Sequence, residues 1–173
     1  MEKKALLIID VQTGLIEYGM TNSEKFIKNI KRLREKAREN LVEIIYVRQK
    51  GELGDEIEYG TSGWEIYAEI IPENNEKVFD KVHNSAFRNT GLKEYLYKKG
   101  ITTLVITGLR TEYCINFTCI SALEHGFNVI IPKDCITTCD SGEYTGSQIN
   151  NFFYNYIWDE NDAEVLEIDE INW

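Results

Sequence analysis

The sequence has few of the residues that several common classes of function need. Its 173 residues include two histidines and two prolines, and no stretch approaches the roughly 18 consecutive apolar residues of a membrane span. Lysine and arginine number 19 against 29 aspartates and glutamates, which gives a net charge of -10. Nucleic-acid binding needs a basic face, so we expect no nucleic-acid partner. Since no apolar stretch is long enough to span a membrane, we expect no membrane partner either.

The four cysteines form no Cys-x-x-Cys pair, which argues against a zinc ribbon and a thioredoxin-type redox motif. They are Cys114, Cys119, Cys135 and Cys139. The apolar run near the N-terminus is too short for the core of a signal peptide. We therefore expect a cytoplasmic protein with reduced thiols, most of them small buried side chains and at most one reactive.

Short apolar runs alternate with amphipathic stretches along the chain, which predicts one α/β domain over residues 1–173 with a mostly parallel sheet. The expected strands are residues 5–9, 42–47, 77–80, 103–107, 127–131 and 163–168. Helices are expected after a capping box at Thr21 and Glu24, over 90–99, over 111–125 and within 143–158. The polar, glycine-rich segment 51–63 is the candidate lid or pocket rim.

Three chemically active side chains follow the expected strands. Asp10 comes directly after the first strand, and Lys81 follows the weak strand 77–80. Cys114 lies in the first turn of the helix after 103–107. Because ligands bind beyond the carboxyl ends of parallel strands, we expect these side chains to share one site.

These residue types suit a nucleophilic thiol. A free thiol is only a few per cent thiolate at neutral pH, so Cys114 needs activation. Its place near a helix N-terminus favours an anion, Asp10 can take its proton, and Lys81 can pair with Asp10 and with developing negative charge. Backbone N–H groups of the turn 108–111 can form an oxyanion hole. Taken singly, the three residues also fit a packed thiol, a loop-anchoring carboxylate and a surface lysine.

Four stretches of the sequence resemble the isochorismatase-like (nicotinamidase-related) cysteine hydrolases. They are LLIIDVQ (6–12), GTSGWEI (60–66), FDKVHNSAF (79–87) and GLRTEYCINFTCISALEHGFNVIIPKDC (108–135). The resemblance runs over roughly residues 5–140. It implies a three-layer, Rossmann-like α/β/α fold with a six-stranded, mostly parallel sheet.

The resemblance also implies a mechanism. Asp10, Lys81 and Cys114 occupy the positions of the family's catalytic triad, with Asp10 as general base and acid, Lys81 as charge stabiliser and Cys114 as the residue that forms a thioester. A non-proline cis peptide is expected between Leu109 and Arg110. It would direct the N–H groups of Arg110 and Cys114 at the oxyanion.

One departure from the family bears on metals and cofactors. Nicotinamidases carry histidine metal ligands after the second strand, whereas the corresponding region 48–52 has none. We therefore predict no metal and no cofactor, and hydrolysis of a small amide-like molecule. Of the two histidines, His125 is expected to cap a helix, and His83 is a candidate for facing the pocket.

Three alternatives stay open at this point. One is a non-catalytic binding or scaffold member of the same fold. Another is a vinyl-ether (isochorismate-type) hydrolase, although nothing in the sequence indicates a site for that dianionic substrate. A thiol redox sensor that pairs Cys114 with Cys119 is the third. Their spacing of five places those two thiols on different helix faces, which argues against this pairing.

Four aromatic residues are candidates for contacts with the substrate: Trp64, Phe87, Tyr113 and Tyr18. Each also fits a core or interface position. Arg110 is a candidate either for recognising a substrate carboxylate or for pairing at the surface. Related proteins commonly form dimers or larger rings, so we expect a homo-oligomer, with the aromatic-rich segment 152–158 either at its interface or packed on its own sheet.

Overall fold

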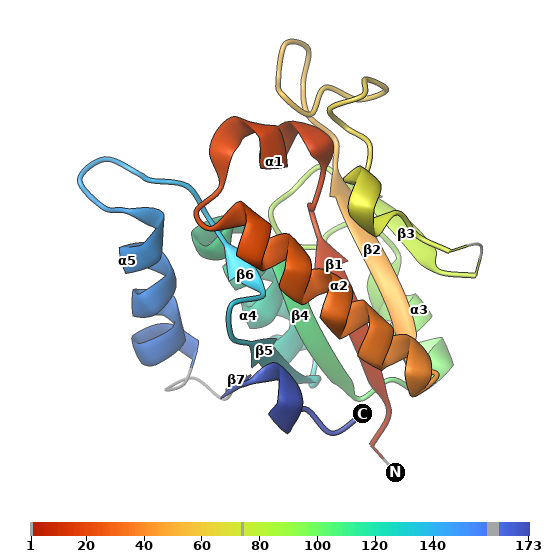
Figure 1. The fold of residues 1–173 in the computed structure, drawn as a ribbon. Helices are drawn as coiled ribbons and strands as arrows, with labels where there is room; N and C mark the ends of the chain where they lie inside the picture. Colours follow the sequence, from red (N-terminus) through yellow and green to blue (C-terminus); the bar gives the residue numbers. More distant parts are fainter. Residues whose placement is uncertain (1, 74, 159–162) are drawn as a thin grey trace.

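A computed structural model describes residues 2–73, 75–158 and 163–173, and a parallel sheet lies at its centre. The strand order is β3-β2-β1-β4-β5-β7, with the short β6 paired to β4 (Figure 1). The strands are β1 (Lys4–Ile9), β2 (Glu43–Gln49), β3 (Lys77–Lys81), β4 (Thr103–Leu109), β5 (Asn128–Pro132), β6 (Ile136–Thr137) and β7 (Ala163–Leu166). All the pairings between these strands are parallel. The predicted α/β class is confirmed, and two-residue β6 adds a seventh strand too short to form an apolar run.

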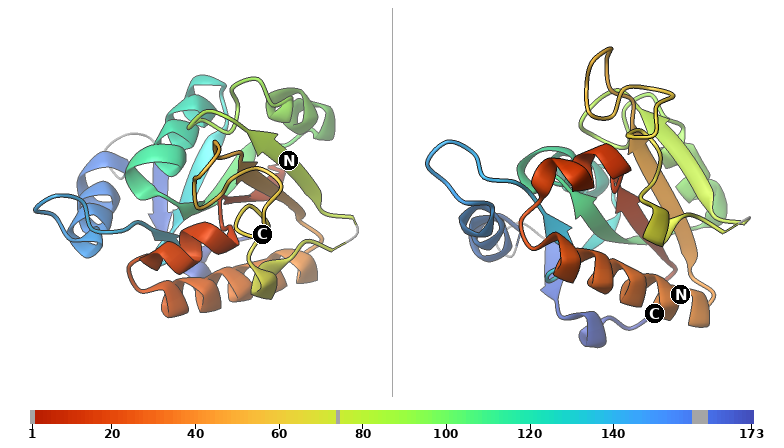
Figure 2. Two further views of the ribbon diagram at one scale, coloured as in Figure 1. Left: turned by 90° about the horizontal axis from the view of Figure 1, so that it is seen from above. Right: turned by 45° about the horizontal axis from the view of Figure 1, so that its top comes forward.

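Helices cover both faces of the sheet, which confirms the three-layer prediction (Figure 2). One face carries α2 (Ser23–Glu39), η1 (Ala68–Ile70) and η4 (Ile168–Glu170). The other carries α3 (Leu92–Lys99), α4 (Asn116–Glu124) and η3 (Phe153–Trp158), which continues α5 (Gly146–Phe152). Within the described ranges, no helix is long and apolar enough to cross a membrane.

The two layers of helices explain why the strands are apolar without interruption. In β1, Leu7 and Ile9 belong to the core under α3 and α4, while Leu6 and Ile8 belong to the core under α2. Successive side chains point to opposite faces of a strand, so both kinds of position are buried. Each such buried side chain contributes about 1.5–3 kcal/mol of hydrophobic stabilisation.

The capping box predicted at Thr21 is wrong. Helix α2 begins at Ser23, and its cap residue Asn22 has a φ of 53° and makes no side-chain cap bond. A capping box occurs instead between Thr145 and Gln148, at the start of α5. A cap residue ordinarily has an extended backbone, and the spacing of Thr21 and Glu24 does not reveal that Asn22 is left-handed.

The aromatic segment near the C-terminus divides between core and surface. Trp158 is buried in the core, and Phe153 and Tyr154 pack against that core. Phe152 and Tyr156 are more than half exposed. Packing on the sheet therefore accounts for part of the segment, and the homo-oligomer stays a prediction.

The segment 51–63 projects beyond the carboxyl-end edge of the sheet, beside α1 (Thr13–Gly19), and contains neither helix nor strand (Figure 1). Two glycines let it approach α1. The N–H of Gly14 donates to the carbonyl of Gly63 at 2.9 Å. A Cβ placed on either glycine would lie 2.0 Å from the carbonyl oxygen of Glu56. The absence of side chains at both positions is what allows the loop to pack there.

We expect Gly14→Ala to destabilise the protein despite the higher helix propensity of alanine. The new methyl group must displace the Glu56 carbonyl, and overpacking of this kind costs about 1–3 kcal/mol. Urea unfolding followed by circular dichroism measures the change. Glu17→Ala, at an exposed position of the same helix, serves as a control with little expected effect. Equal stability of Gly14→Ala and the parent protein would show that the loop is not held against α1.

Candidate active site

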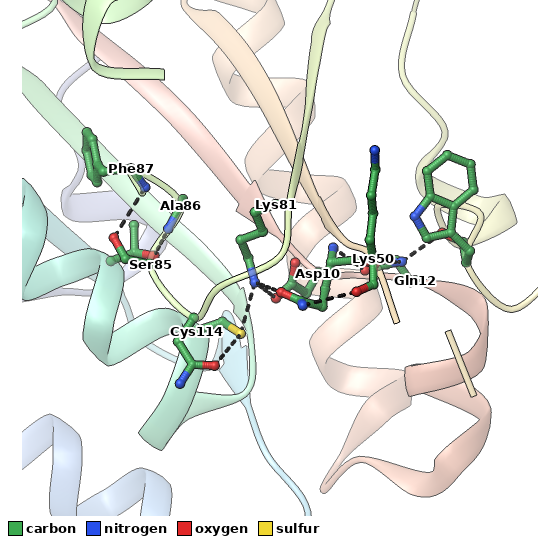
Figure 3. Close-up of polar contacts among 12 residues, drawn as sticks. Asp10, Gln12, Lys50, Lys81, Ser85, Ala86, Phe87 and Cys114 are labelled. Carbon is green, nitrogen blue, oxygen red and sulfur yellow. Dashed lines mark hydrogen bonds and ion pairs between the residues drawn. The ribbon is translucent and has the colours of Figure 1, made fainter. Parts of the chain in front are cut away.

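The three side chains predicted to share a site meet at the carboxyl-end edge of the sheet (Figure 3). Asp10 directly follows β1, Lys81 is the last residue of β3, and Cys114 lies in the wide turn η2 (Thr111–Ile115) that leads into α4. The Lys81 Nζ is 2.7 Å from Asp10 Oδ2 and 3.1 Å from Cys114 Sγ. One ammonium group therefore contacts both the carboxylate and the thiol.

Lys81 has a third acceptor, the Oε1 of Gln49 at the end of β2, at 2.7 Å. An ammonium group has three donors, so Asp10, Cys114 and Gln49 use all of them. The Lys81 side chain is buried. Burial alone would lower the pKa of Lys81, but the negative charge of Asp10 and the hydrogen bonds to Asp10 and Cys114 outweigh it and raise that pKa. Lys81 is therefore a fixed cation within the site.

Gln12, a fully buried residue that was not among the predicted site residues, supports this arrangement. Its Nε2 donates to the carbonyls of Gln49 at 3.0 Å and Trp64 at 2.8 Å. Its Oε1 accepts the Gln49 N–H at 2.9 Å. Gln12 thus joins the end of β1 to the end of β2 and to the loop after it. Its position two residues past Asp10 is the signal that could have identified it.

Burial sets the protonation of the acid and the thiol. Desolvation raises the pKa of Asp10, and the charge of Lys81 opposes this rise. For Cys114, burial and then the negative charge of Asp10 raise the pKa to about 12. The direction of this shift is opposite to the predicted stabilisation of a thiolate. Cys114 holds its proton at neutral pH and needs a base to become a nucleophile.

The turn before Cys114 has the predicted cis peptide between Leu109 and Arg110. Gly108 has a φ of 131°, and a Cβ there would lie 2.0 Å from the carbonyl oxygen of Ile9, so only glycine fits. In the part of the chain that the structure describes, the Arg110 N–H donates to no backbone carbonyl. That N–H is therefore available to an acceptor outside the backbone.

The Arg110 side chain is already paired. Its guanidinium group is 3.2 Å from Glu112 Oε1 and 3.3 Å from Thr138 Oγ1, and it lies over the Tyr113 ring. Of the two roles expected for Arg110, pairing at the surface is the one that the structure shows.

Comparison with known proteins identifies the family. A sequence model described as the isochorismatase domain matches residues 4–156. The chain belongs to the isochorismatase family. The isochorismatase family protein YrdC of Bacillus subtilis is 30% identical over 178 residues, which cover 98% of this chain and 95% of the relative.

Two further comparisons concern a curated relative and a solved structure. A streptothricin hydrolase of Streptomyces noursei is 28% identical over 139 residues, 79% of this chain and 55% of the relative, so the chain spans about half the length of that enzyme. The crystal structure of an isochorismatase from Pseudomonas putida KT2440 has the same fold, with a TM-score of 0.92 and 24% identity. That match covers 98% of this chain and 90% of the other.

Trp64 lies at the edge of the site of this isochorismatase-family chain. Its backbone carbonyl accepts the bond from Gln12, and its ring lies 3.6 Å from the guanidinium carbon of Arg48 and edge-on to Tyr59. The indole N–H is buried and has no partner among the described residues. A donor without an acceptor at this place is consistent with the predicted substrate contact.

Phe87 takes the core position, one of the two expected for it. Its ring stacks on Phe127 and meets His125 edge-on, and it belongs to the core between the sheet and α4. Since neighbouring side chains cover its ring, this position does not favour a substrate contact. Tyr113 and Tyr18 are 44% and 60% exposed, so their contact with a substrate stays a prediction.

The residues where nicotinamidases of the isochorismatase family carry metal ligands do not fit a metal here. Arg48 forms an ion pair with Asp80 at 2.9 Å, Gln49 binds Lys81, and Lys50 lies 3.7 Å from Asp80. Two cationic side chains at this place would repel a metal ion. Within the described ranges, no group of three or more His, Cys, Asp or Glu side chains could hold one.

The other three thiols are buried, as expected. Cys119, Cys135 and Cys139 are all under 10% exposed, whereas Cys114 is partly exposed. Cys119 lies in the core, and burial raises its pKa far above the ordinary thiol range. This environment argues against the redox pairing of Cys119 with Cys114.

Proposed function

We propose that this member of the isochorismatase family is a metal-independent cysteine amidohydrolase that acts on a small amide-like substrate. The contact of one ammonium group with both Asp10 and Cys114 carries the proposal, since it holds a base, a nucleophile and a cation within reach of one reacting carbon. The hydrolase named among the relatives supports the same reaction class.

The first half of the reaction forms a thioester. Asp10 takes the Sγ proton while Cys114 attacks the amide carbon, and the raised pKa of the carboxyl makes it a stronger proton acceptor than a solvated aspartate. The N–H groups of Arg110 and Cys114 stabilise the oxyanion. Lys81 stays charged and balances the negative charge that moves from Asp10 to sulfur and on to oxygen. Asp10 then gives the proton to the leaving nitrogen as the C–N bond breaks.

The second half restores the thiol. Asp10, again ionised, takes a proton from a water molecule that attacks the thioester carbon. The C–S bond breaks, the carboxylic acid product leaves, and the sulfur recovers its proton from Asp10. Trp64, Tyr113 and Tyr18 are the side chains that we assign to contacts with the substrate at the mouth of the site.

Detection of an acyl group on Cys114 tests this proposal. We expect a pool of small amides and esters to give a mass increase on the intact protein, mapped to Cys114 after digestion. Cys114→Ala is expected to lose about 10³-fold or more of the turnover and all of the adduct while keeping its fold. Cys139→Ala, which removes a buried thiol outside the site, should keep both. Full activity of Cys114→Ala would end the proposal, and binding without any adduct would favour a scaffold protein.

A further inference from the structure

A pocket beside the nucleophile has no acidic residue in its walls. Its volume is about 320 Å³, and it is lined by Val82, His83, Asn84, Ser85, Arg88 and Phe117. The Cys114 Sγ donates a long hydrogen bond of 3.9 Å to Asn84 Oδ1, so Asn84 connects the pocket to the catalytic edge. Acidic residues outnumber basic ones by ten in this chain, so a pocket walled by an arginine, a histidine and neutral residues differs in charge from the rest of the protein.

Arg88 in this pocket has no side-chain acceptor among the residues that the structure describes. The other five arginines each bind a carboxylate or a carbonyl: Arg32 binds Asp169, Arg34 the Ile71 carbonyl, Arg38 Glu76, Arg48 Asp80 and Arg110 Glu112. Over residues 2–73, 75–158 and 163–173, the Arg88 guanidinium forms no ion pair and no side-chain hydrogen bond. Its five donors are therefore available to a ligand.

The walls of the pocket are held in place without a ligand. The N–H of Ala86 donates to Thr118 Oγ1 at 3.0 Å, and Ser85 Oγ donates to Ser121 Oγ at 2.8 Å. Both bonds fasten the loop after β3 to α4, the helix that follows Cys114. A pocket whose walls are already ordered loses less entropy when a ligand binds.

We propose that Arg88, with His83 and Asn84, binds a carboxylate on the substrate whose amide carbon reacts at Cys114. The inference rests on the proposed function and adds the substrate class, a short amide with a carboxylate at its other end. The planar guanidinium group matches the two oxygens of a carboxylate, and the His83 ring and the Asn84 amide supply further donors. The Phe117 ring, about half exposed, packs against the carbon linker.

Binding to Cys114→Ala tests the pocket without any chemistry. The probes are malonamate, succinamate and glutaramate, each compared with its uncharged diamide in calorimetry at low salt. We expect at least one monoamide to bind about tenfold or more tightly than its diamide. Adding Arg88→Gln should remove this preference, and adding Arg88→Lys should keep part of it. Adding Lys98→Gln changes the net charge equally at an exposed position of α3 and should leave the preference intact.

The two proposals fail in different ways. Equal affinity for every monoamide and its diamide, or a preference that survives Arg88→Gln, overturns the carboxylate pocket even if Cys114 becomes acylated. A preference that depends on Arg88 supports the pocket even if no acyl group ever forms on Cys114. Where turnover is measurable, Arg88→Gln should raise KM for the monoamide about tenfold or more and leave KM for the diamide unchanged.

Discussion

Asp10→Asn is expected to slow hydrolysis by about 10²–10⁴-fold and at the same time to speed alkylation of Cys114 at neutral pH. The first effect follows because the amide of asparagine cannot take the thiol proton. The second follows because burial and then the negative charge of Asp10 raise the pKa of Cys114 to about 12, whereas the nearby Lys81 lowers that pKa. Removing the carboxylate leaves the ammonium 3.1 Å from the sulfur and favours the thiolate.

The backbone conformation at residue 10 accommodates asparagine. Asp10 has a φ of 55°, a left-handed conformation that asparagine also adopts readily. The measurement is the rate of iodoacetamide labelling at Cys114 against pH, beside the rate of hydrolysis. Asp80→Asn removes a carboxylate that pairs with Arg48 and serves as the control, with a small effect on both rates expected. An unchanged labelling profile in Asp10→Asn would show that Asp10 does not control the thiol.

Lys81→Met should lower the free energy of unfolding by about 3–5 kcal/mol, because it leaves the buried Asp10 carboxylate without its cation. It should also raise the pKa of Cys114 further and abolish turnover. Lys77→Met removes an exposed lysine from the same strand and should change stability little. Urea unfolding of both variants gives the comparison.

A double substitution separates the charge from the packing at Lys81. In Asp10→Asn with Lys81→Met, no buried charge is left unpaired, so much of the lost stability should return while turnover stays absent. If the double variant loses as much stability as Lys81→Met alone, the lysine acts through packing and not through its charge.

Much of the fold could be predicted because its signals are local. The apolar runs at 5–9 and 103–107 lie in buried strands, and parallel strands place their carboxyl ends together. That rule alone brought Asp10, Lys81 and Cys114 to one edge. The prediction of Thr21 as a helix cap failed because the backbone conformation of the next residue decides where a helix begins.

The parts that could not be predicted depend on contacts between distant segments. Gln12 acquires its role from carbonyls 37 and 52 residues away, and neither spacing forms a pattern in the sequence. The direction of the Cys114 pKa shift depends first on burial, which the residues around Cys114 in the sequence do not reveal. Phe87 and Trp64 both lie in stretches that resemble the family. Only the fold shows that the Phe87 ring is in the core and the Trp64 ring is beside the site.

The place of β3 in the sheet has a consequence for the durability of the site. Within the described residues, β3 is an edge strand with β2 as its neighbour, and it carries the lysine that the acid and the thiol share. Edge strands separate from a sheet at a lower free energy than central ones. Fraying at this edge would withdraw the ammonium from Asp10 and Cys114 while β1 and β4 stay paired. The contacts of the thiol thereby depend on a strand that pairs on one side only, so we expect the proposed activity to be lost under conditions in which most of the fold persists.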